Sequence, residues 1–172
     1  MKALFVIRLL EQRDIPEIIE AFRKLGWNKP ASQYEHYFME QVLEVRDVLV
    51  ASVEGKFAGY LTICWNSPYP PFREASIPEI VDLNVLPQYR RQGIGTALMD
   101  KAESEIAKRF HVAGIGVGMD SDYGAAQRLY VLRGYVPDGR GLYSHDYHPT
   151  HGEQVIVDDD LALYFTKELK EK

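Results

Sequence analysis

The segment from Arg90 to Gly95 contains the residue types that a diphosphate group needs. It reads Arg-Arg-Gln-Gly-Ile-Gly and lies between an apolar run that ends at Val85 and an amphipathic stretch that follows. Gly93 and Gly95 allow a tight turn and a close approach of the backbone to a ligand. The N–H groups of a first helical turn lie at the positive end of the helix dipole, and arginines add charge-assisted hydrogen bonds to phosphate. The spacing therefore predicts a diphosphate-binding turn between a strand and a helix.

Two known phosphate loops do not match this segment. It lacks the Gly-Lys-Ser/Thr ending of a Walker loop, and its two glycines fall short of the three in a dinucleotide fingerprint. The glycines alone could serve only to make a tight turn. The paired arginines Arg90 and Arg91 at the start of the helix favour an anion-binding role over that explanation.

The hydrophobic pattern predicts the elements that hold this turn. We expect strands at 3–10, 48–54, 57–66, 79–85, 112–118, 134–137, 141–144, 155–157 and 161–166. We expect helices that run from an Asp14 cap to Gly26, from a Ser32 capping box with Glu35 to Val45, at 95–110 and at 125–133. The order predicts an α/β (α+β) protein with a mixed, mostly antiparallel sheet of six to seven strands and about four helices.

Composition limits the class of protein. The 172 residues are 46% hydrophobic and 26% charged, which predicts one soluble domain over 1–172. The N-terminal apolar run, interrupted at Arg8, is too short for a signal peptide or a membrane span. A single cysteine, Cys64, forms no internal disulfide, so a reducing, cytoplasmic compartment is expected. The net charge of −5 argues against nucleic-acid binding and is compatible with a cationic substrate such as an amine.

Two motifs in register resemble the GNAT acetyltransferase superfamily. Leu83-x-Val85-x-Pro87-x-x-Arg90-Arg91-x-Gly93-Ile94-Gly95 is similar to the family's motif A, and Ala126-x-x-Leu129-Tyr130-x-x-x-Gly134-Tyr135 is similar to motif B. One helix and one strand separate the two motifs, as in the family. The resemblance implies a GNAT fold splayed between the strands at 79–85 and 112–118, with the pantetheine arm of acetyl-CoA in the gap.

The resemblance also implies which residues bind the donor. The backbones of Leu83 and Val85 would contact the pantetheine. The pyrophosphate would lie on the turn, whose implied contact residues are Arg90, Arg91, Gln92, Gly93, Ile94, Gly95 and Thr96. One departure puts a family contact in question, because Tyr123 stands where motif B often has Asn; Ser121 or Asp122 could substitute.

Amide formation from a thioester needs a base for the ammonium and an acid for the leaving thiolate. Tyr130 matches the family tyrosine whose hydroxyl points at the sulfur, although a core aromatic would have the same spacing. Glu79, eleven residues before Arg90, has the spacing of the family's general base, and Asp82 is its rival. In a regular strand these carboxylates face opposite ways, but a β-bulge would exchange the faces. A surface role for either carboxylate, or a water chain as base, stays open.

The sequence therefore predicts an N-acetyltransferase that moves an acetyl group from acetyl-CoA to a primary amine, expected to be a small molecule. Direct attack in a ternary complex is favoured, since no nucleophilic Cys or Ser constellation is recognisable. The alternatives are a non-catalytic acyl-CoA sensor and a protein or peptide N-acetyltransferase, which needs an open groove. The aromatic, proline-rich loop at 67–72 could line a pocket or simply pack over the sheet.

Two further features bear on partners. His145, His148 and His151 recur every three residues, but Pro149 and Gly152 interrupt them, so no metal site is expected. The β-rich C-terminal tail could pair strands across a homodimer.

Overall fold

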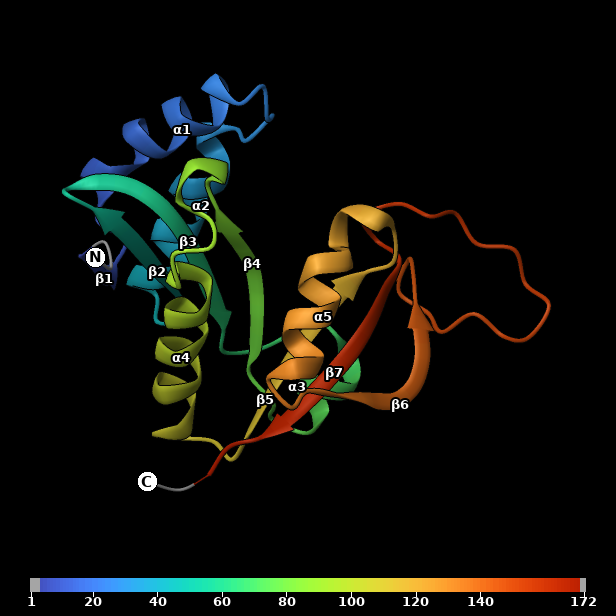
Figure 1. Cartoon of the computed structure of the whole chain (residues 1–172). Coiled ribbons are helices and arrows are strands. Elements are labelled where there is room, and N and C mark those ends of the chain that lie inside the picture. Colours follow the sequence, from blue (N-terminus) through green and yellow to red (C-terminus); the bar gives the residue numbers. More distant parts are fainter. Residues whose placement is uncertain (1–3, 171–172) are drawn as a thin grey trace. The chain divides into compact units, whose positions relative to one another are not determined.

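The computed structural model describes residues 4–170 and forms a mixed α/β fold with seven strands and five α-helices in that range. The strands are β1 (Phe5–Leu9), β2 (Arg46–Val53), β3 (Lys56–Cys64), β4 (Glu79–Val85), β5 (Val112–Gly118), β6 (Val136–Tyr143) and β7 (Ala162–Glu168) (Figure 1). The helices are α1 (Ile15–Lys24), α2 (Ala31–Val42), α3 (Pro70–Glu74), α4 (Ile94–Ala107) and α5 (Gly124–Leu132). The strand order is β1-β2-β3-β4-β5-β7-β6, and the pairs β1–β2, β2–β3, β5–β7 and β6–β7 are antiparallel. The predicted fold class is confirmed.

The chain divides into two compact units. The first unit contains the residues up to Trp65 together with Ile80–Glu105, and the second contains Asn66–Glu79 together with the residues from Ile106 onward. The motif A turn belongs to the first unit and the motif B helix to the second. The splay between 79–85 and 112–118, which involves strands of both units, stays a prediction, and so does a single domain over 1–172.

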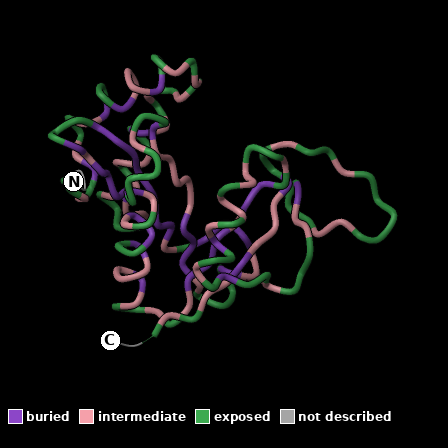
Figure 2. The backbone as a smooth tube through the Cα atoms, viewed as in Figure 1, coloured by how far each residue is buried: buried purple, intermediate pink, exposed green. Residues whose placement is uncertain are grey.

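The core of the first unit lies between two helices and the hairpin of β2 and β3. Glu54 and Gly55 have positive φ angles of 50° and 76°, which suit the tight turn that joins β2 to β3. β2 and β3 are buried along most of their length (Figure 2). The cluster that joins α1 and α2 to one face of this hairpin contains Leu10, Ile15, Ile18, Phe22, Tyr34, Val48, Val50, Phe57, Tyr60 and Leu86.

The second unit is organised around the glycine-rich strand β5. A side chain at Gly116 would stand 2.8 Å from the Tyr164 ring, and one at Gly118 would stand 2.5 Å from the Tyr123 ring. The ring of Phe72 occupies the corresponding space above Gly114. The glycines of β5 therefore make room for a row of aromatic rings on one face of the strand.

Several local predictions differ from the structure. The segment predicted as a loop at 67–72 includes the start of α3, because Pro70 and Pro71 occupy a first helical turn, where a missing N–H costs nothing. Tyr69 and Phe72 are buried, so this segment packs against its own unit. The strand predicted at 155–157 is wrong, since these three apolar residues lie in the long β6–β7 connection, outside any strand.

Two predicted helix boundaries also shift. No capping box forms at Ser32, because α2 begins one residue earlier, after Pro30, whose side chain offers no cap. The helix predicted from Gly95 to 110 begins at Ile94 and ends at Ala107.

Candidate active site

The predicted diphosphate turn follows β4 directly. The chain leaves the strand at Val85, makes a short 3-10 turn over Pro87–Tyr89 and enters α4 at Ile94. Ile94 is buried and anchors the start of the helix, while residues 90 to 93 are exposed. The backbone that the motif predicts to bind phosphate is therefore open to solvent, and buried residues hold it on both sides.

Left-handed backbone shapes this turn. Arg91 has φ 58° and Gly93 has φ 82°, so two of three consecutive residues lie in the region that glycine tolerates best. A side chain at Gly93 would meet no atom within 4 Å. The glycine is needed for its backbone angle and for an open approach to the first N–H groups of α4, which have no acceptor inside the helix. These residues fit a diphosphate group.

Two side chains of the turn donate hydrogen bonds to backbone carbonyls that precede them in the chain. The Arg90 Nε donates to the Val85 carbonyl at 3.0 Å, and its guanidinium lies 6.0 Å from the Trp27 ring centre. The Gln92 amide donates to the Gln88 carbonyl at 3.2 Å. A side chain at Gly95 would stand 3.7 Å from Val85 Cγ2, an ordinary contact distance, and Thr96 is exposed. Of the residues from Arg90 to Thr96 that the sequence singles out, Ile94 is buried, Gly95 is half-buried and the others are exposed, and Leu83 and Val85 on β4 are half-buried.

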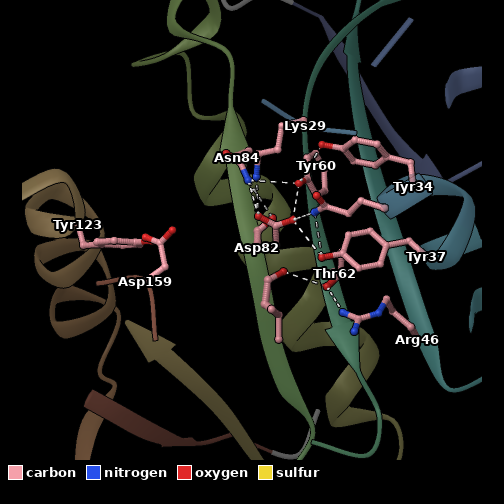
Figure 3. Close-up of polar contacts among 12 residues, drawn as sticks. Lys29, Tyr34, Tyr37, Arg46, Tyr60, Thr62, Asp82, Asn84, Tyr123 and Asp159 are labelled. Atoms are coloured by element: carbon pink, nitrogen blue, oxygen red, sulfur yellow. Dashed lines mark hydrogen bonds and ion pairs between the residues drawn. The ribbon is translucent and has the colours of Figure 1, made fainter. Parts of the chain in front are cut away.

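Asp82 interrupts the regular alternation of β4. Its φ is 62°, which costs a residue with a side chain roughly 1–2 kcal/mol. A left-handed residue within a strand changes which way the following side chains face, as the β-bulge considered for this strand would. This conformation directs the carboxylate of Asp82 toward α2 and β3 (Figure 3).

Five donors surround the Asp82 carboxylate. Oδ2 accepts hydrogen bonds from the Tyr60 hydroxyl, from the Tyr37 hydroxyl at 3.2 Å and from the Gln33 amide at 3.2 Å. Oδ1 accepts from the Asn84 amide at 2.7 Å and lies 3.5 Å from the Lys29 ammonium (Figure 3). The sequence singles out Asp82, but no local pattern in it indicates that these five donors lie around its carboxylate.

The phenols of this cluster are held in their neutral form. Burial first, and then the negative charge of Asp82, raise the pKa of Tyr37 to about 12. Burial also raises the pKa of Tyr60 and of Tyr34 above their usual value, and Tyr34 donates to the Tyr60 hydroxyl at 3.3 Å. Near neutral pH these hydroxyls are therefore hydrogen-bond donors.

Glu79 has different surroundings in the second unit. Only 6% of it is exposed, and its carboxylate accepts a hydrogen bond from the Ser67 hydroxyl. Burial, and then the charge of Glu79, raise the pKa of the Tyr164 hydroxyl above its ordinary value. A buried carboxylate with hydroxyl neighbours is the type of group that enzymes use to transfer protons.

Tyr130 lies on α5 and is 6% exposed. Its ring centre is 6.2 Å from that of Tyr135, the second aromatic residue of motif B, in an edge-on arrangement. Tyr123 precedes the same helix, packs on Gly118 and donates from its hydroxyl to Asp159 at 3.1 Å. Tyr123 thus ties the start of α5 to the end of β5 and to the β6–β7 connection.

His145, His148 and His151, which recur every three residues in the sequence, do not form a cluster in the structure. His145 pairs with Asp158 at 3.7 Å and with Asp160 at 3.5 Å, while the ring of His148 lies 3.5 Å from the Tyr69 hydroxyl. His151 is exposed. Across residues 4–170 there is no group of three His, Cys, Asp or Glu side chains placed to hold a metal ion. Over the same range no helix is long and apolar enough to cross a membrane.

The solved structures similar to this chain share its fold. An N-acetyltransferase from Staphylococcus aureus Mu50 matches with a TM-score of 0.69 and 18% identity over 98% of this chain and 100% of its own. The structure of yncA from Salmonella typhimurium with its cofactor acetyl-CoA has a TM-score of 0.67 and 20% identity, covering 98% and 95% of the two chains. The ribosomal-protein-S18-alanine N-acetyltransferase from Escherichia coli has a TM-score of 0.67 and 19% identity, covering 96% and 94%.

Sequence comparison agrees with the fold. An uncharacterized N-acetyltransferase of Archaeoglobus fulgidus is 34% identical over 98 residues, which are 56% of this chain and 65% of that relative. The model of the acetyltransferase (GNAT) family matches residues 13–135, which include both sequence motifs. Acetyl-CoA is the donor in this family. The chain is a member of the acetyltransferase (GNAT) family.

Proposed function

We propose that this protein transfers an acetyl group from acetyl-CoA to the primary amine of a small molecule. The observation that carries the proposal is the turn after β4, where left-handed Arg91 and Gly93 hold exposed backbone at the start of α4. Such backbone binds a diphosphate through N–H groups and the helix dipole. In this proposal residues Arg90 to Thr96 hold the pyrophosphate of acetyl-CoA, and the backbones of Leu83 and Val85 hold its pantetheine.

Glu79 is proposed as the general base. Its carboxylate takes a proton from the acceptor ammonium, and the neutral amine nitrogen then forms a bond to the thioester carbonyl carbon. Burial of Glu79 beside Ser67 supports this role, since the hydrogen bond holds the carboxylate in place and burial shields it from bulk water. Asp82 is a weaker candidate, because five donors already occupy its oxygens.

Tyr130 is proposed as the general acid. When the carbon–sulfur bond breaks, its hydroxyl gives a proton to the leaving thiolate, so CoA departs as the thiol. The nitrogen loses its second proton as it becomes an amide, and this proton restores the Tyr130 hydroxyl, while Glu79 releases its own proton to solvent. Its position on the motif B helix supports this role. Direct attack is favoured over an acyl-enzyme, because the one cysteine, Cys64, is buried in β3.

The test combines calorimetry with a thiol-release assay. We expect the purified protein to bind acetyl-CoA and to release CoA when it is mixed with members of a panel of small primary amines. Binding without release on any amine or peptide would mean an acyl-CoA sensor. Release only with peptides would mean a protein acetyltransferase, and an absence of binding would overturn the proposal altogether.

A further inference from the structure

The cluster around Asp82 is unusually rich in polar and charged groups for a position within a strand. It brings one carboxylate together with three phenols, two amides and a lysine, all within the first unit (Figure 3). Its partners come from β4 itself, from β3, from α2 and from the segment before α2, and Gln33 lies 49 residues away in the sequence. Backbone strain maintained by surroundings of this kind is characteristic of functional sites.

The two oxygens of Asp82 have different partners. Oδ2 is saturated by three neutral donors from Gln33, Tyr37 and Tyr60, which fix the carboxylate in place. Oδ1 has one neutral donor, Asn84, and its second contact is the Lys29 ammonium at 3.5 Å. Oδ1 therefore presents a fixed, negatively charged position to a cation.

Lys29 is the replaceable member of this cluster. It comes from the segment between α1 and α2, whereas the other donors stand on α2, β3 and β4. Its side chain is 24% exposed and that of Asp82 is 17% exposed, so the ion pair is reachable from solvent. Lys29 Nζ also lies 5.9 Å from the centre of the Phe22 ring, in aromatic surroundings that favour an alkylammonium group.

We propose that Asp82 binds a cationic group of the acceptor, and that Lys29 occupies this position until the acceptor arrives. The inference rests on the proposed acetyl transfer and names its substrate class. Because the lone pairs of Asp82 are occupied by fixed donors, the group bound there keeps its charge and is distinct from the amine that is acetylated. The acceptor is then a small molecule with two amines or with an amine and another permanent cation. Asp82 directly precedes Leu83, so this site adjoins the stretch of β4 proposed to hold the pantetheine.

The test compares two acceptors that differ by one charge, 1,5-diaminopentane and 1-aminopentane. We expect the wild-type enzyme to prefer the diamine in kcat/KM by at least about tenfold. Asp82→Asn keeps the size of the side chain and removes its charge, and should raise the KM for the diamine by about 10- to 100-fold while the KM for acetyl-CoA stays unchanged. Lys29→Met removes the competing ammonium and should lower the KM for the diamine several-fold. Lys24→Met, an exposed lysine of α1 paired with Glu20, is the matched control and should change neither value.

Three results would overturn the inference: no preference for the diamine, an unchanged diamine KM in Asp82→Asn, or a raised diamine KM in Lys29→Met. If Asp82→Asn does not fold, the Lys29→Met result decides, because its predicted gain is not produced by damage to the structure. If the enzyme acetylates monoamines and diamines equally, this inference fails and the proposed function survives. If it acetylates neither, the proposed function fails, and calorimetry of 1,5-diaminopentane with the wild-type and Asp82→Asn proteins still tests the cation site: equal affinity in both would overturn it.

Discussion

Glu79 and Asp82 are close in sequence on β4, yet their surroundings suit different roles. Glu79 is almost fully buried beside Ser67, whereas Asp82 is left-handed, partly exposed and surrounded by donors. The sequence identified both carboxylates but could not distinguish them, because strand parity is lost where the backbone changes conformation. The distinction depends on Tyr37, Tyr60 and Ser67, whose positions are set by the fold.

Tyr130→Phe tests the proposed acid. Without the hydroxyl, the thiolate must leave unprotonated or take its proton from water, so kcat should fall by about 100-fold or more while the KM for acetyl-CoA is retained. Steady-state thiol release measures both values. Tyr135→Phe, which alters the neighbouring buried tyrosine of the same motif, is the control and should keep most of the activity. Full activity in Tyr130→Phe would remove Tyr130 from the mechanism.

Tyr37 should make stability depend on alkaline pH. Its pKa is about 12 in the folded protein and near 10 in an unfolded chain. Between these values the unfolded state binds fewer protons, so the free energy of unfolding falls as the pH rises. Between pH 8 and pH 11, urea denaturation should show a smaller decrease in the free energy of unfolding for Tyr37→Phe than for the wild type. Tyr147→Phe, whose ring is on the surface, should behave like the wild type; an identical loss in Tyr37→Phe would contradict the account.

At the scale of elements, the turn into α4 could be predicted because its signals are local. Gly93, the arginines before it and the periodic apolar residues after it lie within one short stretch. The strand predicted at 155–157 failed for the opposite reason. A strand needs a partner, and three adjacent apolar residues do not show whether a neighbouring strand exists. The start of α3 was missed because its prolines are equally typical of a loop.

Gly93→Ala tests the turn against a matched glycine. Gly93 has φ 82° and Gly55 has φ 76°, and a side chain at either would meet no atom within 4 Å. Both substitutions to Ala should therefore lower the free energy of unfolding by a similar amount, about 1 kcal/mol. Only Gly93→Ala should weaken acetyl-CoA binding, by roughly tenfold or more in calorimetry, since it changes the backbone proposed to hold the pyrophosphate. Equal acetyl-CoA affinity in the two variants would place the diphosphate elsewhere.

The glycines of β5 offer a second test of an element. A side chain at Gly118 would overlap the Tyr123 ring, with the nearest distance 2.5 Å, whereas one at Gly124 would meet nothing within 4 Å. We expect Gly118→Ala to destabilise the protein by roughly 1–3 kcal/mol in urea denaturation. Gly124→Ala, at helical φ −56°, should be neutral or stabilising by up to about 1 kcal/mol. Equal free energies of unfolding for the two variants would contradict this, because the Tyr123 ring would then move aside without a loss of stability.

At the scale of the whole molecule, fold and donor follow from the sequence more directly than the acceptor does. The α/β class, the mostly antiparallel strands and the GNAT family rest on periodicity and on two motifs in register, and all three are confirmed. The proposed acceptor class rests on side chains that the fold gathers, such as Lys29, Tyr37 and Tyr60 around Asp82. No local pattern in the sequence indicates that gathering.

The most direct test of the account is mass spectrometry of the amine after incubation with acetyl-CoA and the purified protein. 1,5-Diaminopentane should gain one acetyl group, with one CoA released for each acetyl group transferred. The Gly93→Ala protein should form the same product more slowly at limiting acetyl-CoA, while Gly55→Ala should match the wild type. Bound acetyl-CoA with no acetylated amine, across the diamine and the wider panel, would contradict the central claim that this protein is an amine acetyltransferase.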